Sequence, residues 1–284
     1  MWSGFEFSAT YRNRDHAFKY DISANLSTLK NKVTSLGIGK DSYITGAYAT
    51  YVGQEIGQFY GWVYEGIART QSDLDNHATQ QGVNVGDCLY KDISGPEGTP
   101  DGVIDAYDQT VLGSGLPKVN FGLSTHMEYK GFDLNISTYG VLNYHVSDDI
   151  YNSLNSCYGY GNKEVGMLDA NRWSEDGTYL SSVPRTYAAN NATLAWNDLF
   201  SSRKIQNAAY WKIANVELGY NFPDKWFGGY VSGVRLYVSA QNLYTFTGYH
   251  GYNVDYAGGT FTPGYNFCSF PSARTFMAGL HFTF

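Results

Sequence analysis

One-by-one alternation of apolar and polar residues, over stretches of about ten residues, constrains the fold of this chain most. The last ten residues show it best, with an apolar set that consists of Phe276, Ala278, Leu280, Phe282 and Phe284. Successive residues of a β-strand point to opposite faces of a sheet, so this stretch predicts a strand with one apolar and one more polar face. Helical periodicity is scarce elsewhere, and the pattern therefore indicates an all-β fold.

The alternation recurs upstream in residues 5–12, 19–26, 121–128, 132–137, 214–222 and 234–241. Together with a less regular stretch at 48–67, these segments predict about eight strands in an antiparallel meander. The polar positions include charged side chains such as Lys19, Asp21 and Glu217, which a dry core would not readily accept. Strands of this length with an apolar outer and a polar inner face are typical of an outer-membrane β-barrel.

The connections between the expected strands differ in length according to the end of the sheet on which they lie. Long loops are expected at residues 67–117, 145–207 and 247–272, and short turns at 129–131 and 223–232. Long loops at one end and short turns at the other are the layout of a transmembrane barrel. Structureless loops of this length would count against a compact soluble domain. The hairpin that turns at residues 13–16 is the one departure from this layout.

Composition narrows the class of protein further. Aromatic residues make up 17% of the chain and charged residues only 16%, and the net charge is −7. An acidic chain without a basic face is not expected to bind nucleic acid. No apolar run reaches the roughly 18 residues of a membrane-spanning helix, and the first residues lack the pattern of a secretory leader. The three cysteines, Cys88, Cys157 and Cys268, are widely spaced and predict isolated thiols.

A set of short motifs resembles the SusC/RagA family of TonB-linked outer-membrane receptors. In chain order they are GQEIGQFYG (53–61), EGI (65–67), GD…YKD (86–92), DGVID with a further Asp (101–108), the 113–118 segment ending in LPK, YKGFDL (129–134), RW (172–173), NVELGY (215–220), VSAQNLYTFT (238–247) and PSARTF (271–276). The order of the set is that of the family, and the resemblance runs from about residue 5 to Phe284.

The resemblance implies a large outer-membrane barrel of about 22 strands, occluded by an N-terminal plug. It also implies a SusD-like surface lipoprotein as a lid and the import of glycans or peptides with energy passed through TonB. Residues 1–284 match the C-terminal barrel part, so the plug, the TonB-contacting region and the N-terminal strands are expected to lie outside this segment. We therefore expect a receptor fragment in the cell outer membrane of a Bacteroidetes species that does not transport cargo alone. The alternative is a soluble β-sandwich module that binds carbohydrate.

Acidic residues gather in one expected loop. Asp92, Asp101, Asp105 and Asp108 resemble the spacing of a calcium loop, in which carboxylate oxygens surround a hard cation on a turning backbone. The segment at 95–100 interrupts that spacing, and no terminal Glu follows. The other interpretation is a solvated turn held by side-chain hydrogen bonds. Calcium is the only cofactor that the sequence suggests.

The aromatic residues of the long loops are the best candidates for contact with a ligand or a lid protein. These are Tyr158, Tyr160, Trp173, Trp196, Tyr249 and Tyr252. Flat, amphipathic rings suit both the faces of sugars and protein partners. The alternative is that these rings pack one loop against another.

The C-terminal strand has a further expected role. Its residues Phe276, Leu280, Phe282 and Phe284 resemble the signal by which the barrel-assembly machinery recognises its clients, although an ordinary last strand of a soluble sheet would look similar. No catalytic motif accompanies it, because the six histidines are scattered and no nucleophile elbow is present. We therefore expect a receptor in contact with lipid, not an enzyme.

Overall fold

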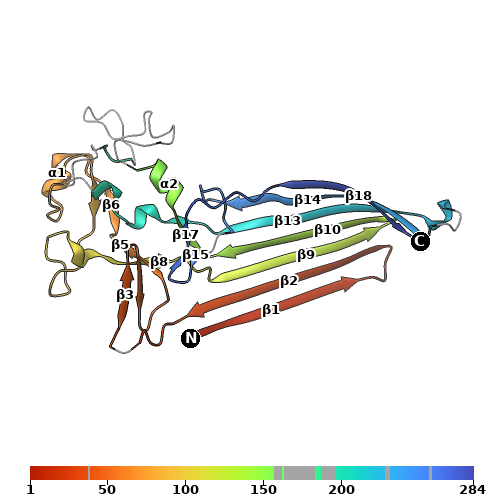
Figure 1. The fold of residues 1–284 in the computed structure, drawn as a ribbon, viewed down its shortest axis with the longest axis horizontal. Helices are drawn as coiled ribbons and strands as arrows, with labels where there is room; N and C mark the ends of the chain where they lie inside the picture. The colour runs from red at the N-terminus through yellow and green to blue at the C-terminus, as the bar shows by residue number, and fades with distance from the viewer. Residues whose placement is uncertain (38, 157–161, 163–182, 187–195, 228–230, 256–257) are drawn as a thin grey trace.

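Seven long antiparallel strands form the main sheet of the computed structural model. The structure describes residues 1–37, 39–156, 162, 183–186, 196–227, 231–255 and 258–284. In spatial order the strands are β1 (Trp2–Asn13), β2 (Phe18–Asn31), β9 (Val119–Tyr129), β10 (Phe132–Leu142), β13 (Tyr210–Phe222), β14 (Gly233–Thr247) and β18 (Thr275–Thr283). Each strand pairs with the next long strand of the chain, as the predicted all-β meander requires (Figure 1).

Apolar and polar residues lie on opposite faces of this sheet. The strand register aligns Tyr20, Met127, Leu134, Leu218 and Val238 in one row across five strands. The adjacent row on the other face consists of Asp21, His126, Asn135, Glu217 and Ser239. Registered alternation therefore produces one continuous apolar face and one continuous polar face, which confirms the pattern expected for a barrel wall.

The apolar face is uncovered in the chain as described. Phe5 is 84% exposed, Phe276 is 69% exposed and Val238, on a strand with a neighbour on each side, is 52% exposed. Apolar rows of this extent on a folded sheet mark contact with lipid or with another protein. Separately, the described helices include none with the length and apolar character needed to cross a membrane.

The polar face carries an ion-pair network near the short turns. Arg235 donates from Nη2 and Nε to the two carboxylate oxygens of Asp133, at 2.5 and 3.0 Å, and from Nη2 to Glu217 Oε1 at 2.7 Å. The three residues come from three adjacent strands, so the network ties β10, β13 and β14 together on the polar side.

The expected strand at residues 48–67 is not part of the main sheet, and the count of about eight strands is corrected to seven. This segment folds instead into short strands within a single connection that runs from β2 to β9. With seven strands, the hairpin at residues 13–16 no longer departs from the expected layout, because the connections between the main strands alternate strictly between short and long. Figure 1 shows the short turns at one end of the sheet with the C-terminus, and the long connections gathered at the other.

The long connections have secondary structure and cores of their own. The first holds β3 (Ser42–Thr45), β4 (Tyr48–Tyr51), β5 (Gln58–Gly61), β6 (Tyr64–Ile67), α1 (Gln71–Asp75), β7 (Cys88–Tyr90), η1 (Ala106–Asp108) and β8 (Thr110–Ser114). The second holds β11 (His145–Asp148), α2 (Asp149–Leu154), η3 (Ser202–Lys204) and β12 (Gln206–Asn207). The third holds β15 (Gly258–Gly259), β16 (Thr262–Pro263) and β17 (Tyr265–Asn266), while η4 (Asp224–Trp226) lies in a short turn.

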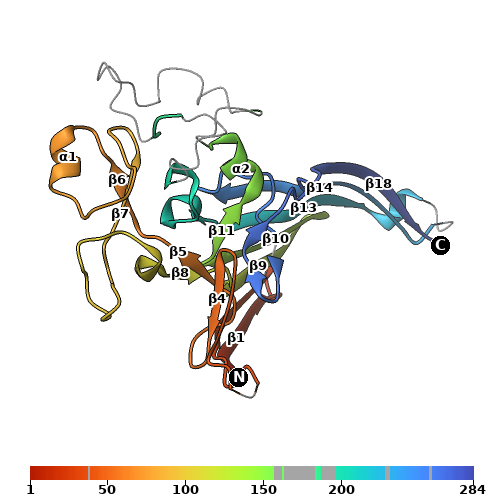
Figure 2. The same ribbon diagram turned by 60° about the vertical axis from the view of Figure 1, so that its left-hand side comes forward.

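Most buried side chains lie at this end of the molecule and not in the sheet. One cluster joins β10, β11 and the third connection through Val141, Val146 and Tyr249, and a second surrounds Tyr90 and Cys88. The sheet itself is curved, and Figure 2 shows β1 and β18 well separated at its two edges. The hydrophobic core therefore supports the long connections, while the main sheet leaves both of its faces available.

Candidate functional site

A β-bulge positions the charged residues of the candidate site. The pairing of β13 with β14 shifts between Ile213 and Asn215, and Asn242 in the shifted region has a left-handed φ of 51°. The shift resets the alternation, so that Lys212 and not Ile213 lies on the polar face, opposite Thr245. Asn is one of the few residues other than Gly that adopt this backbone conformation readily.

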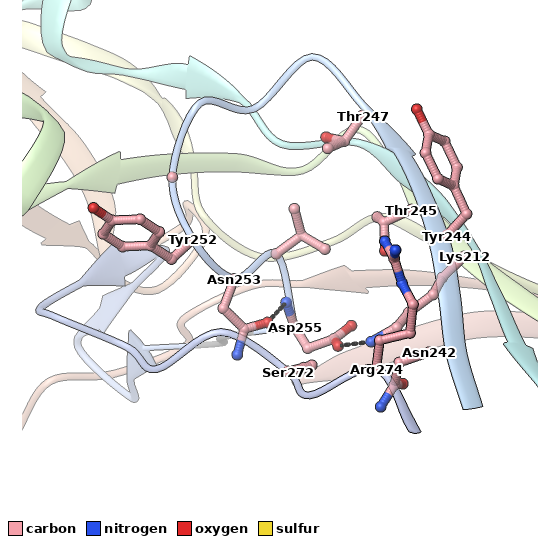
Figure 3. A pocket seen from close by; sticks show the side chains of 12 residues that line it. Lys212, Asn242, Tyr244, Thr245, Thr247, Tyr252, Asn253, Asp255, Ser272 and Arg274 are labelled. Carbon is pink, nitrogen blue, oxygen red and sulfur yellow. Dashed lines mark hydrogen bonds and ion pairs between the residues drawn. The ribbon is translucent and has the colours of Figure 1, made fainter. Parts of the chain in front are cut away.

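The site itself is a cavity of about 330 Å³ between the loop-side ends of β13 and β14 and the connection to β18. Its lining consists of Lys212, Asn242, Tyr244, Thr245, Thr247, Gly251, Tyr252, Asn253, Val254, Asp255, Ser272 and Arg274. Figure 3 shows the connection arching over the cavity, with Lys212 and Asp255 facing one another across it. Polar and hydroxyl side chains dominate this lining, so it offers a ligand mainly hydrogen-bond donors and acceptors.

Lys212 and Asp255 form the central ion pair of the cavity. Lys212 is only 4% exposed, and its Nζ lies 2.6 Å from Asp255 Oδ2. The Tyr139 hydroxyl donates to the other oxygen of Asp255 at 3.3 Å, and the Asp255 amide donates to Asn253 Oδ1 at 3.0 Å. This ion pair ties the third connection to the sheet, because Lys212 is buried and would lose the partner of its charge if the connection moved away.

Behind the cavity, a buried polar cluster holds the connection in place. The hydroxyl of Tyr249 donates to Asp148 Oδ2, and Asn266 Nδ2 donates to the same oxygen at 3.0 Å. Burial, and then the hydrogen bond to Asp148, raise the pKa of Tyr249 well above its ordinary value. The phenol therefore stays protonated and acts as a donor that satisfies a carboxylate with 3% exposure.

The six aromatic residues expected to contact a ligand separate into three groups. Tyr252 lines the cavity and is 63% exposed, so it is placed for such contact. Tyr249 is buried, and Trp196 packs against Tyr90 and Trp62 with its Nε1 donating to Gln81 O at 2.8 Å, which corresponds to the packing alternative. Tyr158, Tyr160 and Trp173 lie outside the described residues.

The four acidic residues considered for calcium lie in a hydrogen-bonded turn. Asp108 Oδ2 accepts from the Asp105 amide at 2.8 Å, Asp105 Oδ1 accepts from the Tyr107 amide, and Asp92 Oδ2 accepts from the Gly102 amide at 2.7 Å. Asp101 similarly accepts from Val103, two residues on. Within the residues that the structure describes, no three acidic, His or Cys side chains are gathered as a metal ligand set. The arrangement corresponds to the alternative of a turn held by its own side chains, and calcium binding stays a prediction.

The residues expected to act as an assembly signal lie on the last strand of the sheet. Phe276, Leu280 and Phe282 lie on the apolar face of β18 with half or more of their surface exposed, and Phe284 is 92% exposed. β18 pairs with β14 alone, so the described chain leaves its other edge open.

The sequence did not single out Lys212, Asp255 or Arg274 as site residues. Lys212 falls on the polar face only because of the bulge, and Asp255 reaches it from a connection whose path the alternation does not predict. Asn242 and Arg274 do belong to motifs that carried the family resemblance, which is the one signal that pointed to this region.

Comparison with known proteins identifies relatives along the whole segment, although no family model matches the chain. TonB-dependent receptor P3 of Formosa agariphila is 30% identical over 99% of this chain and 28% of the relative. TonB-dependent receptor SusC of Bacteroides thetaiotaomicron is 26% identical over 99% of this chain and 26% of its own length. The chain is similar along its length to TonB-dependent receptors, SusC among them. The resemblance carried by the motifs is thus confirmed.

The fold agrees with that relationship. The structure of the RagAB peptide transporter superposes with a TM-score of 0.76 over 98% of this chain and 28% of the RagAB chain, at 21% identity. The segment therefore has the all-β fold of a TonB-dependent receptor barrel. It spans somewhat over a quarter of the length of the curated relatives that it matches.

Proposed function

We propose that this segment forms part of the barrel wall of an outer-membrane receptor that imports glycans or peptides with energy from TonB. The two-faced sheet carries the proposal. Seven registered strands present an apolar face that no described segment covers and a polar face with charged networks. A wall between lipid and an aqueous lumen needs both faces at once.

The dimensions of the strands and their aromatic residues support a membrane position. The main strands run for 9 to 15 residues, and about 9–11 tilted residues cross the apolar layer of a bilayer. Aromatic pairs lie near both ends of the sheet, with Trp211 stacked on Phe246 at 5.3 Å toward the long connections and Phe132 near Tyr220 at 4.7 Å toward the short turns. Such girdles are typical of the two membrane interfaces.

The further partners of the proposal belong to the complete receptor. They are outer-membrane lipid on the apolar face, a SusD-like lipoprotein over the long connections, TonB through a region outside this segment, and the barrel-assembly machinery at β18. The cargo would pass on the polar side. The relatives named above are TonB-dependent receptors, and we propose transport without covalent chemistry for this chain.

A soluble β-sandwich that binds carbohydrate is disfavoured by the same sheet. A sandwich buries one face of each sheet against the other at a spacing of about 10 Å. Here the apolar row that contains Leu218 and Val238 is 45% and 52% exposed at those positions, and the described short strands lie at one end of the sheet instead of over it.

The test determines which end of the sheet is accessible from outside intact cells. In the receptor as encoded in its source, one epitope tag is inserted at Asp15, in the short turn after β1, and another at Gly98, in the first long connection. We expect antibody to stain the Gly98 tag on intact cells, and the Asp15 tag only after the outer membrane is permeabilised. Deletion of TonB should abolish uptake of labelled cargo without changing this staining. Recovery of the receptor in the soluble fraction would contradict the proposal.

A further inference from the structure

Arg274 is the charged residue of the cavity that remains uncompensated. Of the three charged residues in the lining, Lys212 and Asp255 neutralise each other at 2.6 Å. Arg274, just before β18, is exposed and makes no ion pair with any residue that the structure describes. Figure 3 shows its side chain on the same side of the cavity as Lys212, toward Thr245. The lining thus has two cations and one anion, although the chain as a whole has a net charge of −7.

The nearest further acid does not change this balance within the cavity. Asp148 lies behind the wall, against Gly251, and is 3% exposed. Its oxygens accept from the Tyr249 hydroxyl, from Asn266 and from the Tyr151 amide. Because these donors already satisfy the carboxylate, it is not directed at a ligand in the cavity or at Arg274.

The backbone that carries Arg274 is fixed by the bulge. Asn242 Nδ2 donates to the carbonyl oxygen of Ala273 at 2.9 Å, directly before Arg274 in the chain. This bond ties the start of β18 to the irregular part of β14, so the backbone that carries Arg274 is held at the cavity before a ligand arrives. Pre-organisation of this kind lowers the entropic cost of binding.

We propose that this cavity recognises a carboxylate group of the cargo, with Arg274 as the residue that binds it. A guanidinium presents two parallel N–H donors that match the two oxygens of a carboxylate, and the single uncompensated charge suits a singly charged group. The exposed ring of Tyr252 and the hydroxyls of Thr245 and Ser272 contact the remainder of the ligand. This inference rests on the proposed import function, and it adds the chemical class of the cargo.

The experiment compares acidic ligands with matched neutral ones on the intact receptor purified from its outer membrane. One pair is tetragalacturonate and its methyl ester, and the other is tetra-alanine and its C-terminal amide. The two pairs distinguish a uronic acid from a peptide C-terminus as the source of the carboxylate. Affinities are measured by titration calorimetry at low and high salt for the native receptor, Arg274→Gln and Arg274→Lys. Lys225→Gln, which removes an exposed cation at the opposite end of the sheet, is the matched control.

We expect the native receptor to bind the acidic member of at least one pair ten-fold or more tightly than the neutral member, since charged hydrogen bonds are of about that strength. Arg274→Gln should remove this preference, Arg274→Lys should retain part of it, and Lys225→Gln should leave it unchanged. Added salt should reduce the preference, because the site is open to solvent.

Equal binding of both members of each pair by the native receptor overturns the inference and leaves the import function in place. A preference that survives in Arg274→Gln also overturns it. If no member of either pair binds, the inference is overturned, and the import function is still decided separately by the staining of the two tags and by TonB-dependent uptake. The comparison within the native receptor needs no variant, so a variant that fails to fold does not prevent the test.

Discussion

At the scale of single residues, the long connections are joined by a few buried polar side chains. Asp87 is 1% exposed and accepts from Arg185 Nε and Nη2 at 2.6 and 2.9 Å, and from Asn197 Nδ2 at 2.8 Å. Asn197 in turn accepts from the Cys88 amide at 2.7 Å. The first and second long connections are thereby linked by the ion pair of Asp87 and Arg185, and each carboxylate oxygen of Asp87 has a hydrogen-bond partner.

We predict that Asp87→Ala loosens this junction, because Arg185 and Asn197 lose their common acceptor. The loss of one partner of a buried ion pair costs about 3–5 kcal/mol, and the 26% exposure of the Arg185 side chain reduces this to about 2–3 kcal/mol. Hydrogen exchange at the Cys88 amide measures the free energy of local opening. Asp75→Ala, on the exposed face of α1, is the control and should change this free energy by less than about 0.5 kcal/mol. Equal effects of the two variants would contradict the prediction.

At the scale of elements, the sequence predicts the faces of the strands better than their number. Alternation places Leu134 and Glu217 correctly, because side-chain direction in a strand follows directly from the backbone. It fails at Tyr48 and Phe59, which look like residues of a barrel strand but are buried in short strands of a long connection. The candidate site was mostly missed, since its ion pair depends on a bulge and on a contact between residues 43 positions apart.

The bulge itself leads to a prediction about Asn242. A β-branched residue at its φ of 51° is strained, so Asn242→Val should destabilise the sheet by roughly 1–2 kcal/mol. Asn242→Gly loses the same bond to Ala273 but accepts the backbone conformation. The difference between the two variants in thermal unfolding in detergent therefore isolates the backbone effect. Indistinguishable melting temperatures for these two variants would show that the bulge tolerates the strain.

The small sheet of β12, β11 and β17 should respond to acid through His145. Burial, which exceeds the effect of nearby groups, lowers the pKa of His145 below its ordinary value near 6.5, and Lys118 acts in the same direction. The folded state thus prefers the neutral ring. The contribution of the neutral His145 ring to stability is present above pH 6.5 and is lost as the pH falls from there toward the lowered pKa.

We expect amides of β11 and β12 to exchange faster at pH 5.5 than at pH 7.5, after correction for the intrinsic effect of pH on exchange. His145→Gln should remove this difference, whereas His16→Gln, in the exposed turn after β1, should retain it. An unchanged pH dependence in His145→Gln would assign the effect to another group.

At the scale of the whole molecule, the main sheet has two open edges. Among the residues that the structure describes, β1 pairs only with β2 and β18 only with β14, so each outer strand has one edge of backbone donors and acceptors that pairs with no described strand. Neither lipid nor detergent can satisfy such groups, and sheets usually respond by pairing with other sheets. The described chain therefore depends on neighbouring strands for a stable membrane form.

We predict that residues 1–284, expressed alone and refolded in detergent, form multimers instead of a closed monomer. Light scattering coupled to size exclusion measures the mass of the protein in the micelle. As a comparison, the intact receptor under the same conditions should be monodisperse. A monomeric product with the heat-modifiable mobility of a closed barrel would show that the sheet can close on itself.

The separate cores of the long connections have a consequence for how receptors of this kind diversify. Register is set along the strands and at the short turns, whereas the far end builds its own small sheets around residues such as Tyr90 and Tyr144. Insertions, deletions or exchange of whole connections there leave the pairing of the seven strands unchanged. Recombination at one end of the sheet can therefore give the long connections a new surface, while the seven-stranded scaffold stays as it is.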